Sequence, residues 1–322
     1  MNPLVSILIP CLNAERWIAQ AIESALAQTW PEKEVIVVDD GSTDGSLAII
    51  KLFAGRIRWE TGPNRGGNVA RNRLLELARG EWIQYLDADD YLLPDKIAKQ
   101  MAFLGAHPEA EIVFGPWIME HWSEHGSLRV LLEIREPRDP WILLPLWFLP
   151  QTGGPLWRRD ALKEVGGWKP DQPCCQEYDL YLRLLMAGKC FTYCSEAGAI
   201  YRQWSDQTVC KRDKPETLRQ RLEITMRAED FLRSHRELTP LRLRAISQGR
   251  FESARQAWLF DPELASAIVD SIRGSEPQFV PAGTAAPWYY RIMYRMFGFR
   301  AAERLATIKR GVMSLVQETP AG

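Results

Sequence analysis

Over its first ninety residues the chain alternates short apolar runs with stretches of helical periodicity. Short apolar runs between prolines or turn residues are typical of buried strands, and apolar residues that recur every three or four positions indicate helices. The predicted strands are 4–10, 34–40, 56–60 and 81–90. The predicted helices are 17–26, 44–53 and 68–78, with Asn13 as the cap of the first and Gly80 as the stop of the third.

Strands that alternate with helices predict an α/β fold, in which helices cover both faces of a mainly parallel, Rossmann-like sheet. In such sheets ligands bind beyond the carboxyl ends of the strands. Two predicted strands end in acids, one in Asp39 and Asp40 and the other in the "DADD" of 87–90. We therefore expect both acidic clusters to lie at the binding edge of the sheet.

The character of the chain changes near residue 210, and we predict a boundary there between a domain 1–210 and a mainly α-helical region 211–322. The second part contains segments of helical pattern at 215–234 and 251–260, which include many of its arginines, and at 261–274. Asp261 is the expected cap of the last helix and Gly274 its expected stop.

The net charge of -1 conceals an uneven distribution, because residues 1–210 carry 21 Lys and Arg against 28 Asp and Glu, and the remainder carries 19 against 13. The acidic domain 1–210 argues against nucleic-acid binding and suits a metal cation. The six cysteines show no paired spacing typical of zinc sites. The start shows no signal-peptide pattern, and the apolar segment 140–150 is too short to span a bilayer. We expect a cytoplasmic protein with reduced thiols.

Two acidic motifs are candidates for chemistry. In an extended segment Asp87 and Asp89 point to the same side, where two carboxylates repel each other unless a cation such as Mg²⁺ or Mn²⁺ lies between them. The alternative is a polar turn after a strand. The segment "VVDDGSTDGS" is either a common Asp-Gly turn or a loop whose carboxylate accepts hydrogen bonds from a base or a ribose. It contains neither a dinucleotide fingerprint nor a P-loop.

A third candidate lies where a helical pattern begins at Tyr178. Glu177 and Asp179 stand at or near the N-terminus of this predicted helix, where the helix dipole favours ionised carboxylates. They are either ordinary first-turn acids or, for Glu177, a general base.

Taken in order, these segments resemble the family 2 glycosyltransferases of GT-A fold. The resemblance rests on "SILIPCLNAERWIAQAIESALAQTWPEKEVIVVDDGSTDGS", "GGNVARNRLLELARGEWIQYLDADDYLLPDKI" and "GGW…QEYDLYLRL", and it covers about residues 4–205, or two thirds of the chain. It implies an inverting transfer of a sugar from a nucleotide diphosphate, with uridine as the expected base, to an acceptor hydroxyl. The implied substrate contacts are Pro10, Leu12, Asn13, Asp39, Asp40, Arg71, Asp87 and Ala88.

The resemblance also implies roles for the remaining acids. Asp89, with Asp87, would hold Mn²⁺ or Mg²⁺ against the diphosphate, and Asp40 would be the main contact of the base. In the family, the general base is the Asp of an "ED" pair. This chain has "QE" at that place, so the resemblance implies Glu177 as the general base, with Asp179 as the second candidate. The segment 199–208 resembles the part that closes the acceptor side but lacks a histidine that some relatives have there.

Two other functions stay open. The first is a nucleotidyltransferase, which also combines paired acids with an α/β sheet. Such an enzyme normally has a Gly-rich, basic loop after the first strand, and "PCLNAERW" does not have this composition. The second is a non-catalytic nucleotide-sugar-binding module, which would explain the altered "QE".

The acceptor would be a glycan, a lipid-linked molecule or a small molecule, and aromatic residues such as Trp157 flank its expected side; these rings can equally be core residues. The basic, aromatic segment 287–311 either docks on its own domain or lies on an anionic membrane surface, which would place the protein at the inner membrane face.

Overall fold

The computed structural model of the chain describes residues 2–123, 126–204 and 212–317. Its contacts divide the chain into two units, of which the first comprises Met1–Pro140 and Phe148–Arg212 and the second comprises Trp141–Trp147 and Asp213–Gly322. The first unit contains the α/β sheet and the second is helical. Residue 210, at which the sequence predicted a boundary, lies outside the described residues.

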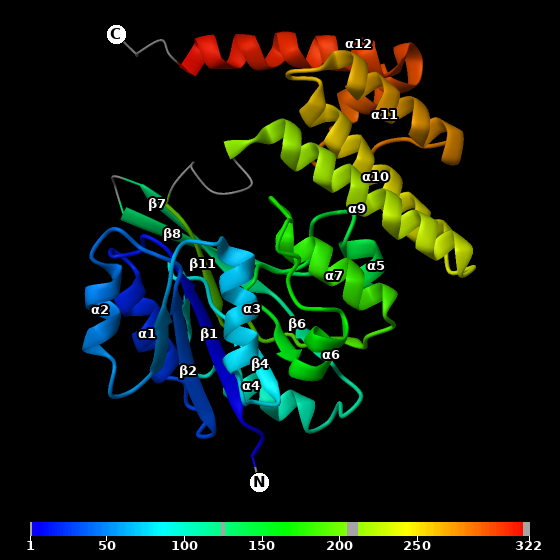
Figure 1. Ribbon diagram of the computed structural model, residues 1–322. Helices are drawn as coiled ribbons and strands as arrows, with labels where there is room; N and C mark the ends of the chain where they lie inside the picture. Colours follow the sequence, from blue (N-terminus) through cyan, green and yellow to red (C-terminus); the bar gives the residue numbers. More distant parts are fainter. Residues whose placement is uncertain (1, 124–125, 205–211, 318–322) are drawn as a thin grey trace. The chain divides into compact units, whose positions relative to one another are not determined.

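The main sheet of the first unit has seven strands among the described residues, in the order β10-β6-β9-β4-β1-β2-β3 (Figure 1). Every pairing is parallel except the two made by β9. The β-branched and other apolar residues of the central strands are fully buried, as in a sheet covered on both faces. The strands are β1 (Val5–Cys11), β2 (Lys33–Asp39), β3 (Arg58–Thr61), β4 (Trp82–Tyr85), β6 (Ile112–Phe114), β9 (Leu156–Arg158) and β10 (Phe191–Tyr193).

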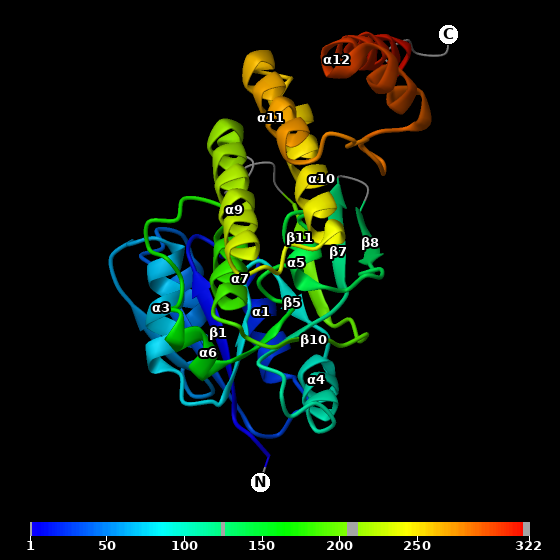
Figure 2. The same cartoon turned by 90° about the vertical axis from the view of Figure 1, so that its right-hand side faces the viewer.

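Helices cover both faces of this sheet because the chain reverses its direction across it. Right-handed crossovers place α1 (Ile18–Leu26) and α2 (Ser46–Leu52), which lead from β1 through β2 to β3, on one face. The return from β3 to β4 places α3 (Gly67–Leu77) on the other face, and Figure 2 shows α3 and α1 on opposite sides of β1. The reversal makes the gap between β1 and β4 the topological switch point of the sheet, where α/β proteins bind ligands.

A smaller sheet adjoins the carboxyl end of β4. Its order is β5-β11-β7-β8, with β11 antiparallel to β5 and parallel to β7. Because β5 follows the acidic turn directly, this sheet brings β11 next to the turn. The strands are β5 (Tyr91–Leu92), β7 (Trp117–Ser123), β8 (Gly126–Leu132) and β11 (Ala199–Gln203). The first unit also contains α4 (Lys96–Leu104), α6 (Arg159–Glu164) and α7 (Gln176–Met186), whereas α5 (Pro140–Leu143) belongs, except for Pro140, to the second unit.

The first three long helices of the helical unit begin in the same way. Asp213, Thr239 and Asp261 each accept a hydrogen bond from a backbone N–H of the first turn, and a proline stands at the first or second position after each cap. Phe251, which is fully buried, packs against Tyr290 and Tyr294. The helices are α9 (Lys214–Ser234), α10 (Pro240–Ala257), α11 (Pro262–Ser275) and α12 (Trp288–Gln317).

Several local expectations were wrong. Asn13 is not a helix cap, because α1 begins at Ile18 and Asn13 contacts another loop. Gly80 does not stop α3, which ends at Leu77; instead its N–H donates to the Ser6 hydroxyl, and a Cβ there would lie 2.6 Å from the Ser6 nitrogen. Gly274 lies inside α11, which continues to Ser275.

Gly115 supplies a stability test of the main sheet. A Cβ at this position, directly after β6, would lie 2.0 Å from the carbonyl oxygen of Cys194, so the backbone of one segment would have to move. We expect Gly115→Ala to lower the free energy of unfolding of the first unit by about 3 kcal/mol, seen as a lower Tm in thermal denaturation followed by circular dichroism. Gly55→Ala, which would meet no atom within 4 Å, is the matched control. Equal Tm values for the two variants would contradict this packing.

Candidate functional site

The carboxyl ends of β2, β1 and β4 lie side by side at one edge of the main sheet. The three strands are adjacent and parallel, with Cys11 paired to Asp39 and Leu8 paired to Tyr85. In Figure 1, β1 rises from the N-terminus, so this edge is the upper one. Neighbouring strands are about 4.8 Å apart. The two acidic clusters, at 39–40 and at 87–90, are therefore separated by one strand, and the structure brings them to the same edge.

The loop after β1 is tied to the loop after β2. Asn13 adopts a left-handed conformation with φ of 50°, in which its side-chain oxygen accepts the N–H of Thr43 at 2.8 Å and its own N–H donates to the Ser42 hydroxyl at 2.9 Å. Pro10 is half-buried and Leu12 is 43 % exposed, so this loop offers an accessible surface at the strand ends.

The carboxylates of Asp39 and Asp40 hold the neighbouring loop. Asp39 accepts the Thr61 hydroxyl at 2.7 Å, and the two oxygens of Asp40 accept the N–H groups of Arg65 and Gly66 at 2.8 and 2.9 Å. Asp40 is only 6 % exposed. A carboxylate oxygen can accept two hydrogen bonds. Asp40 thus organises the loop 61–66 and retains acceptor capacity for a ligand.

The segment 87–90 is a turn, and the expectation that it is extended was wrong. The N–H of Asp90 donates to the carbonyl oxygen of Asp87 at 3.0 Å, which closes the turn, and Ala88 within it is buried. Simple alternation therefore does not orient these side chains. Asp87 is instead oriented by Arg71, whose guanidinium donates to its carboxylate at 2.9 Å.

Arg71 connects the acidic turn to the start of α7. A second nitrogen of its guanidinium donates to the side-chain oxygen of Gln176 at 3.1 Å, and the group lies over the ring of Trp168 at 4.7 Å. Burial lowers the pKa of Arg71, but the nearby carboxylates of Asp87 and Glu177 outweigh burial and raise it. The guanidinium therefore stays charged between the two acids.

Glu177 lies in the first turn of α7, and its carboxylate accepts the Thr152 hydroxyl at 2.8 Å. The side chain is half-buried. Asp179 is different, because it is 1 % exposed and pairs with Arg183 one turn later at 2.7 Å. This ion pair lies inside the protein, so Asp179 is not accessible from solvent, whereas Glu177 is partly exposed.

Strand β11 and Trp204, which follows it directly, supply contacts that the sequence analysis missed. The indole N–H of Trp204 donates to the Asp89 carboxylate at 2.9 Å, and the N–H of Arg202 donates to the Asp90 carboxylate at 2.8 Å. The fully buried guanidinium of Arg202 donates to the carbonyl oxygen of Asp89 and stacks over Trp17 at 4.1 Å. An arginine in the otherwise strand-like segment 199–203 was the available signal. Residues 205–208 of the segment predicted to close the acceptor side lie outside the described residues.

The turn accumulates negative charge that the protein only partly compensates. Burial, followed by the charge of Asp87, raises the pKa of Asp89, and burial together with the other two carboxylates raises the pKa of Asp90 well above its ordinary value. Within the described residues, His, Cys, Asp and Glu form no group of three or more that could hold a metal ion. Asp87 and Asp89 nevertheless fit a hard cation that takes its remaining ligands from water and phosphate oxygens, because they are oxygen donors with excess negative charge.

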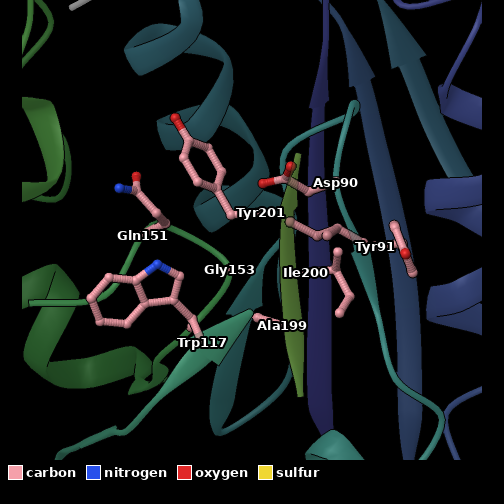
Figure 3. A pocket seen from close by; sticks show the side chains of 10 residues that line it. Asp90, Tyr91, Trp117, Gln151, Gly153, Ala199, Ile200 and Tyr201 are labelled. Atoms are coloured by element: carbon pink, nitrogen blue, oxygen red, sulfur yellow. The ribbon is translucent and has the colours of Figure 1, made fainter. Parts of the chain in front are cut away.

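A small pocket lies beside the turn, on the side of the second sheet (Figure 3). Figure 3 shows the carboxylate of Asp90 directed toward Tyr201, with Gln151 and Trp117 across the pocket. Burial and the charges of Asp90, Glu177 and Asp87 raise the pKa of Tyr201, so its hydroxyl is protonated. The buried indole N–H of Trp117 makes no hydrogen bond to any residue that the structure describes. Gln151 precedes Thr152, which binds Glu177, and the pocket is therefore close to that carboxylate.

The interpretation of Trp157 as a substrate contact was wrong. Its side chain is fully buried in β9 and stacks on Tyr181 with ring centroids 5.1 Å apart. Trp168 is also buried, beneath Arg71. These rings support the site from within, whereas Trp204 is 44 % exposed.

Comparison with known proteins decides the family. The model of the family "Glycosyl transferase family 2" matches residues 6–165. The putative glycosyltransferase EpsE of Bacillus subtilis (strain 168) is 30 % identical over 219 residues, which are 66 % of this chain and 76 % of the relative. The chain belongs to glycosyl transferase family 2. An uncharacterized glycosyltransferase of Haemophilus influenzae is 42 % identical over 106 residues, and this match spans 32 % of the chain and 42 % of that relative.

Solved structures show the same fold. Residues 1–349 of Staphylococcus aureus TarS in complex with UDP-GlcNAc superpose with a TM-score of 0.58 at 17 % identity, over 85 % of this chain and 90 % of that one. The mannosyltransferase PcManGT of Pyrobaculum calidifontis in complex with GDP-Man and Mn²⁺ gives a TM-score of 0.52 at 17 % identity, over 97 % and 81 %. The predicted family and GT-A fold are thus confirmed. No helix in the described part of this family 2 chain is long and apolar enough to cross a membrane.

Proposed function

We propose that this protein is an inverting glycosyltransferase that moves a sugar from a nucleotide diphosphate, with uridine as the base, to an acceptor hydroxyl. The observation that carries the proposal is the chain of contacts from Asp87 through Arg71 to Gln176, because it holds the acidic turn next to Glu177. Family membership supports sugar transfer over nucleotidyl transfer. The two structural neighbours were solved with different nucleotide sugars, UDP-GlcNAc and GDP-Man.

The nucleotide would lie along the edge formed by the ends of β1, β2 and β4. Asp39 and Asp40, which fix the loop 61–66, would accept hydrogen bonds from the base and ribose, and Pro10 to Asn13 would border the base. The charge of Arg71 beside Asp87 would face the phosphates. Because ligands of open α/β sheets bind at the switch point between strands, this placement follows from the topology.

Glu177 would carry out the proton transfer. Its carboxylate, held by Thr152, would accept the proton of the acceptor hydroxyl while that oxygen forms a bond to the anomeric carbon. The bond between the anomeric carbon and the phosphate oxygen breaks at the same time, and its electron pair leaves with the nucleoside diphosphate. A single displacement inverts the anomeric centre.

Asp89 and Asp87 would hold Mn²⁺ or Mg²⁺, which stabilises the negative charge that develops on the leaving diphosphate. On the protein side, Trp204 orients Asp89 through its indole N–H and Arg71 orients Asp87. The pocket of Asp90, Gln151 and Tyr201, in which Gln151 directly precedes the Thr152 that binds Glu177, would admit a polar group of the acceptor.

A donor screen tests this function. We expect one or more UDP-sugars, added with Mn²⁺ at about one hundred times their Kd, to stabilise the protein by about 2.7 kcal/mol and so to raise its Tm. A chelator should remove most of the shift, and slow hydrolysis of the same donor should be detectable. A module that only binds nucleotide sugars would show the Tm shift without hydrolysis, whereas no shift with any nucleotide sugar would contradict the proposal.

We also propose that the protein works in the cytoplasm. Cys11, Cys190 and Cys194 are free thiols, and Cys11 and Cys194 are buried. Unpaired cysteines are typical of reducing compartments. The support is compositional, and it concerns the compartment alone.

A further inference from the structure

Helix α12 leaves an apolar face uncovered. Trp288, Ile292 and Met296 are 68 %, 47 % and 65 % exposed, and their spacing of four residues places them on one face of the helix. On the opposite face Tyr290 and Tyr294 are buried against Phe251 of α10. The helix is therefore anchored through its tyrosines, and its exposed apolar face is not required for that packing.

Cations border this apolar face. Arg291 and Arg295 are exposed and lie three and seven residues after Trp288, so they stand along one side of the apolar stripe. The only acid in 287–311 is Glu303, and its side chain is fully buried, where it binds Arg255 and accepts the Tyr290 hydroxyl. In the described part of α12 every exposed charged side chain is thus positive.

The pattern continues beyond a break in the helix. Gly298, with φ of 78°, interrupts α12, and in the following turns Leu305 and Ile308 are 42 % and 64 % exposed. Arg304 and Lys309 are exposed on the same part of the helix. We call the exposed residues of one face before this break the α12 face; its members are Trp288, Arg291, Ile292, Arg295 and Met296.

We propose that the α12 face binds an anionic membrane surface. Exposed tryptophan, isoleucine and methionine side chains with arginines beside them match helices that lie in the plane of a membrane, where apolar residues enter the interface and cations contact lipid phosphates. A second copy of the same face would bring like charges together, which opposes association. The proposal does not depend on the sugar-transfer site, because it rests on the helical unit alone.

Vesicle flotation tests the proposal with the full chain. Vesicles of phosphatidylcholine alone and vesicles with 30 % phosphatidylglycerol, a fraction chosen at roughly the anionic content that polybasic segments recognise, are compared at about 0.1 M salt. We expect the protein to float with the anionic vesicles and to remain largely unbound with the neutral ones. Equal binding to both, or no binding to either, would overturn the proposal.

Charge variants locate the contact. Each arginine near an anionic surface contributes about 1 kcal/mol, so the double change Arg291→Gln and Arg295→Gln should lower the partition coefficient about 30-fold. The double change Arg56→Gln and Arg135→Gln removes the same charge from exposed arginines of the first unit and should leave binding nearly unchanged. Circular dichroism of each variant checks that the fold is intact.

An apolar variant separates insertion from simple charge attraction. Trp288→Ala with Ile292→Ala should weaken binding to anionic vesicles at least tenfold, because roughly 25 cal/mol is lost per Å² of apolar surface that no longer enters the interface. Unchanged binding of this variant or of the arginine variant would overturn the proposal. So would a concentration-dependent dimer in analytical ultracentrifugation that the same substitutions abolish, since the face would then join two copies of the chain.

Discussion

Replacing Glu177 by glutamine is expected to lower kcat for sugar transfer about 1,000-fold while the affinity for the donor stays within about twofold, the scale of effect usual for loss of a general base. Glutamine keeps an oxygen that can accept the Thr152 hydroxyl, so the start of α7 should not change. It cannot take the proton of the acceptor hydroxyl. Steady-state kinetics with the donor found in the screen, together with the donor-induced Tm shift, measures both effects.

Two matched variants strengthen this test. Glu177→Asp keeps a carboxylate and should retain more activity than Glu177→Gln. Asp179→Asn breaks the buried pair with Arg183, so it should lower the Tm and affect kcat less than Glu177→Gln. Full activity of Glu177→Gln, or a larger kcat loss in Asp179→Asn at a temperature where it is folded, would show that the base was assigned to the wrong residue.

Replacing Asp89 by asparagine is expected to abolish the effect of Mn²⁺ on nucleotide affinity and to lower kcat/KM at least 100-fold, since a metal ion supplies several kcal/mol of charge stabilisation. The side-chain oxygen of asparagine can still accept the indole N–H of Trp204. Titration calorimetry of UDP with Mn²⁺ and with a chelator measures the coupling. Asp171→Asn, an exposed acid, is the control. Mn²⁺-dependent UDP binding that survives in Asp89→Asn would contradict the metal assignment.

The same variant has a pH-dependent effect on stability. Burial and Asp87 raise the pKa of Asp89 in the folded protein, so folding favours its protonated form. The free energy of unfolding of the metal-free wild type therefore falls as the pH rises from the pKa of Asp89 in the unfolded chain through its raised pKa in the folded protein. This loss persists at neutral pH. Asparagine carries no charge and removes this cost, so metal-free Asp89→Asn should have a Tm at pH 7.5 at or above that of the wild type.

The main sheet was predictable because its signal is local. Each central strand is a short apolar run that ends in turn residues. β1, β2 and β3 lie within a few residues of the predicted segments, whereas β4 ends at Tyr85, before the predicted end at 90. Helix ends were less predictable. Asn13 has the side chain of a cap, but its oxygen binds the N–H of Thr43, a residue far along the chain, and no pattern near Asn13 indicates that contact.

The site was predictable in its position and less so in its contacts. Parallel strands place the acids after β2 and β4 at one edge, as expected from the alternation of elements. The bonds from Asp40 to the loop at 65–66, and those of Arg202 and Trp204 to the acidic turn, join segments 25 to 115 residues apart. Trp157 shows that residue type alone does not predict a substrate contact. An aromatic residue near a site in sequence can lie in the core as easily as at the surface.

The family resemblance identified candidate residues that the pattern of apolar and polar positions did not indicate. It identified Arg71 as a residue of the site, and the structure places its guanidinium between Asp87 and Gln176. It did not indicate that Asp179 forms a buried ion pair, because that pair depends on Arg183 one helical turn away. Roles carried over by motif thus needed the side-chain geometry before one acid could be preferred as the base.

A crystal structure of the protein with UDP and Mn²⁺ tests the central claim most directly. The account predicts the ion on the carboxylates of Asp87 and Asp89, the diphosphate against it, and the uracil beside Asp39 and Asp40, all at the carboxyl edge of β2, β1 and β4. A nucleotide bound elsewhere, or an ion that contacts neither carboxylate of the turn, would contradict it.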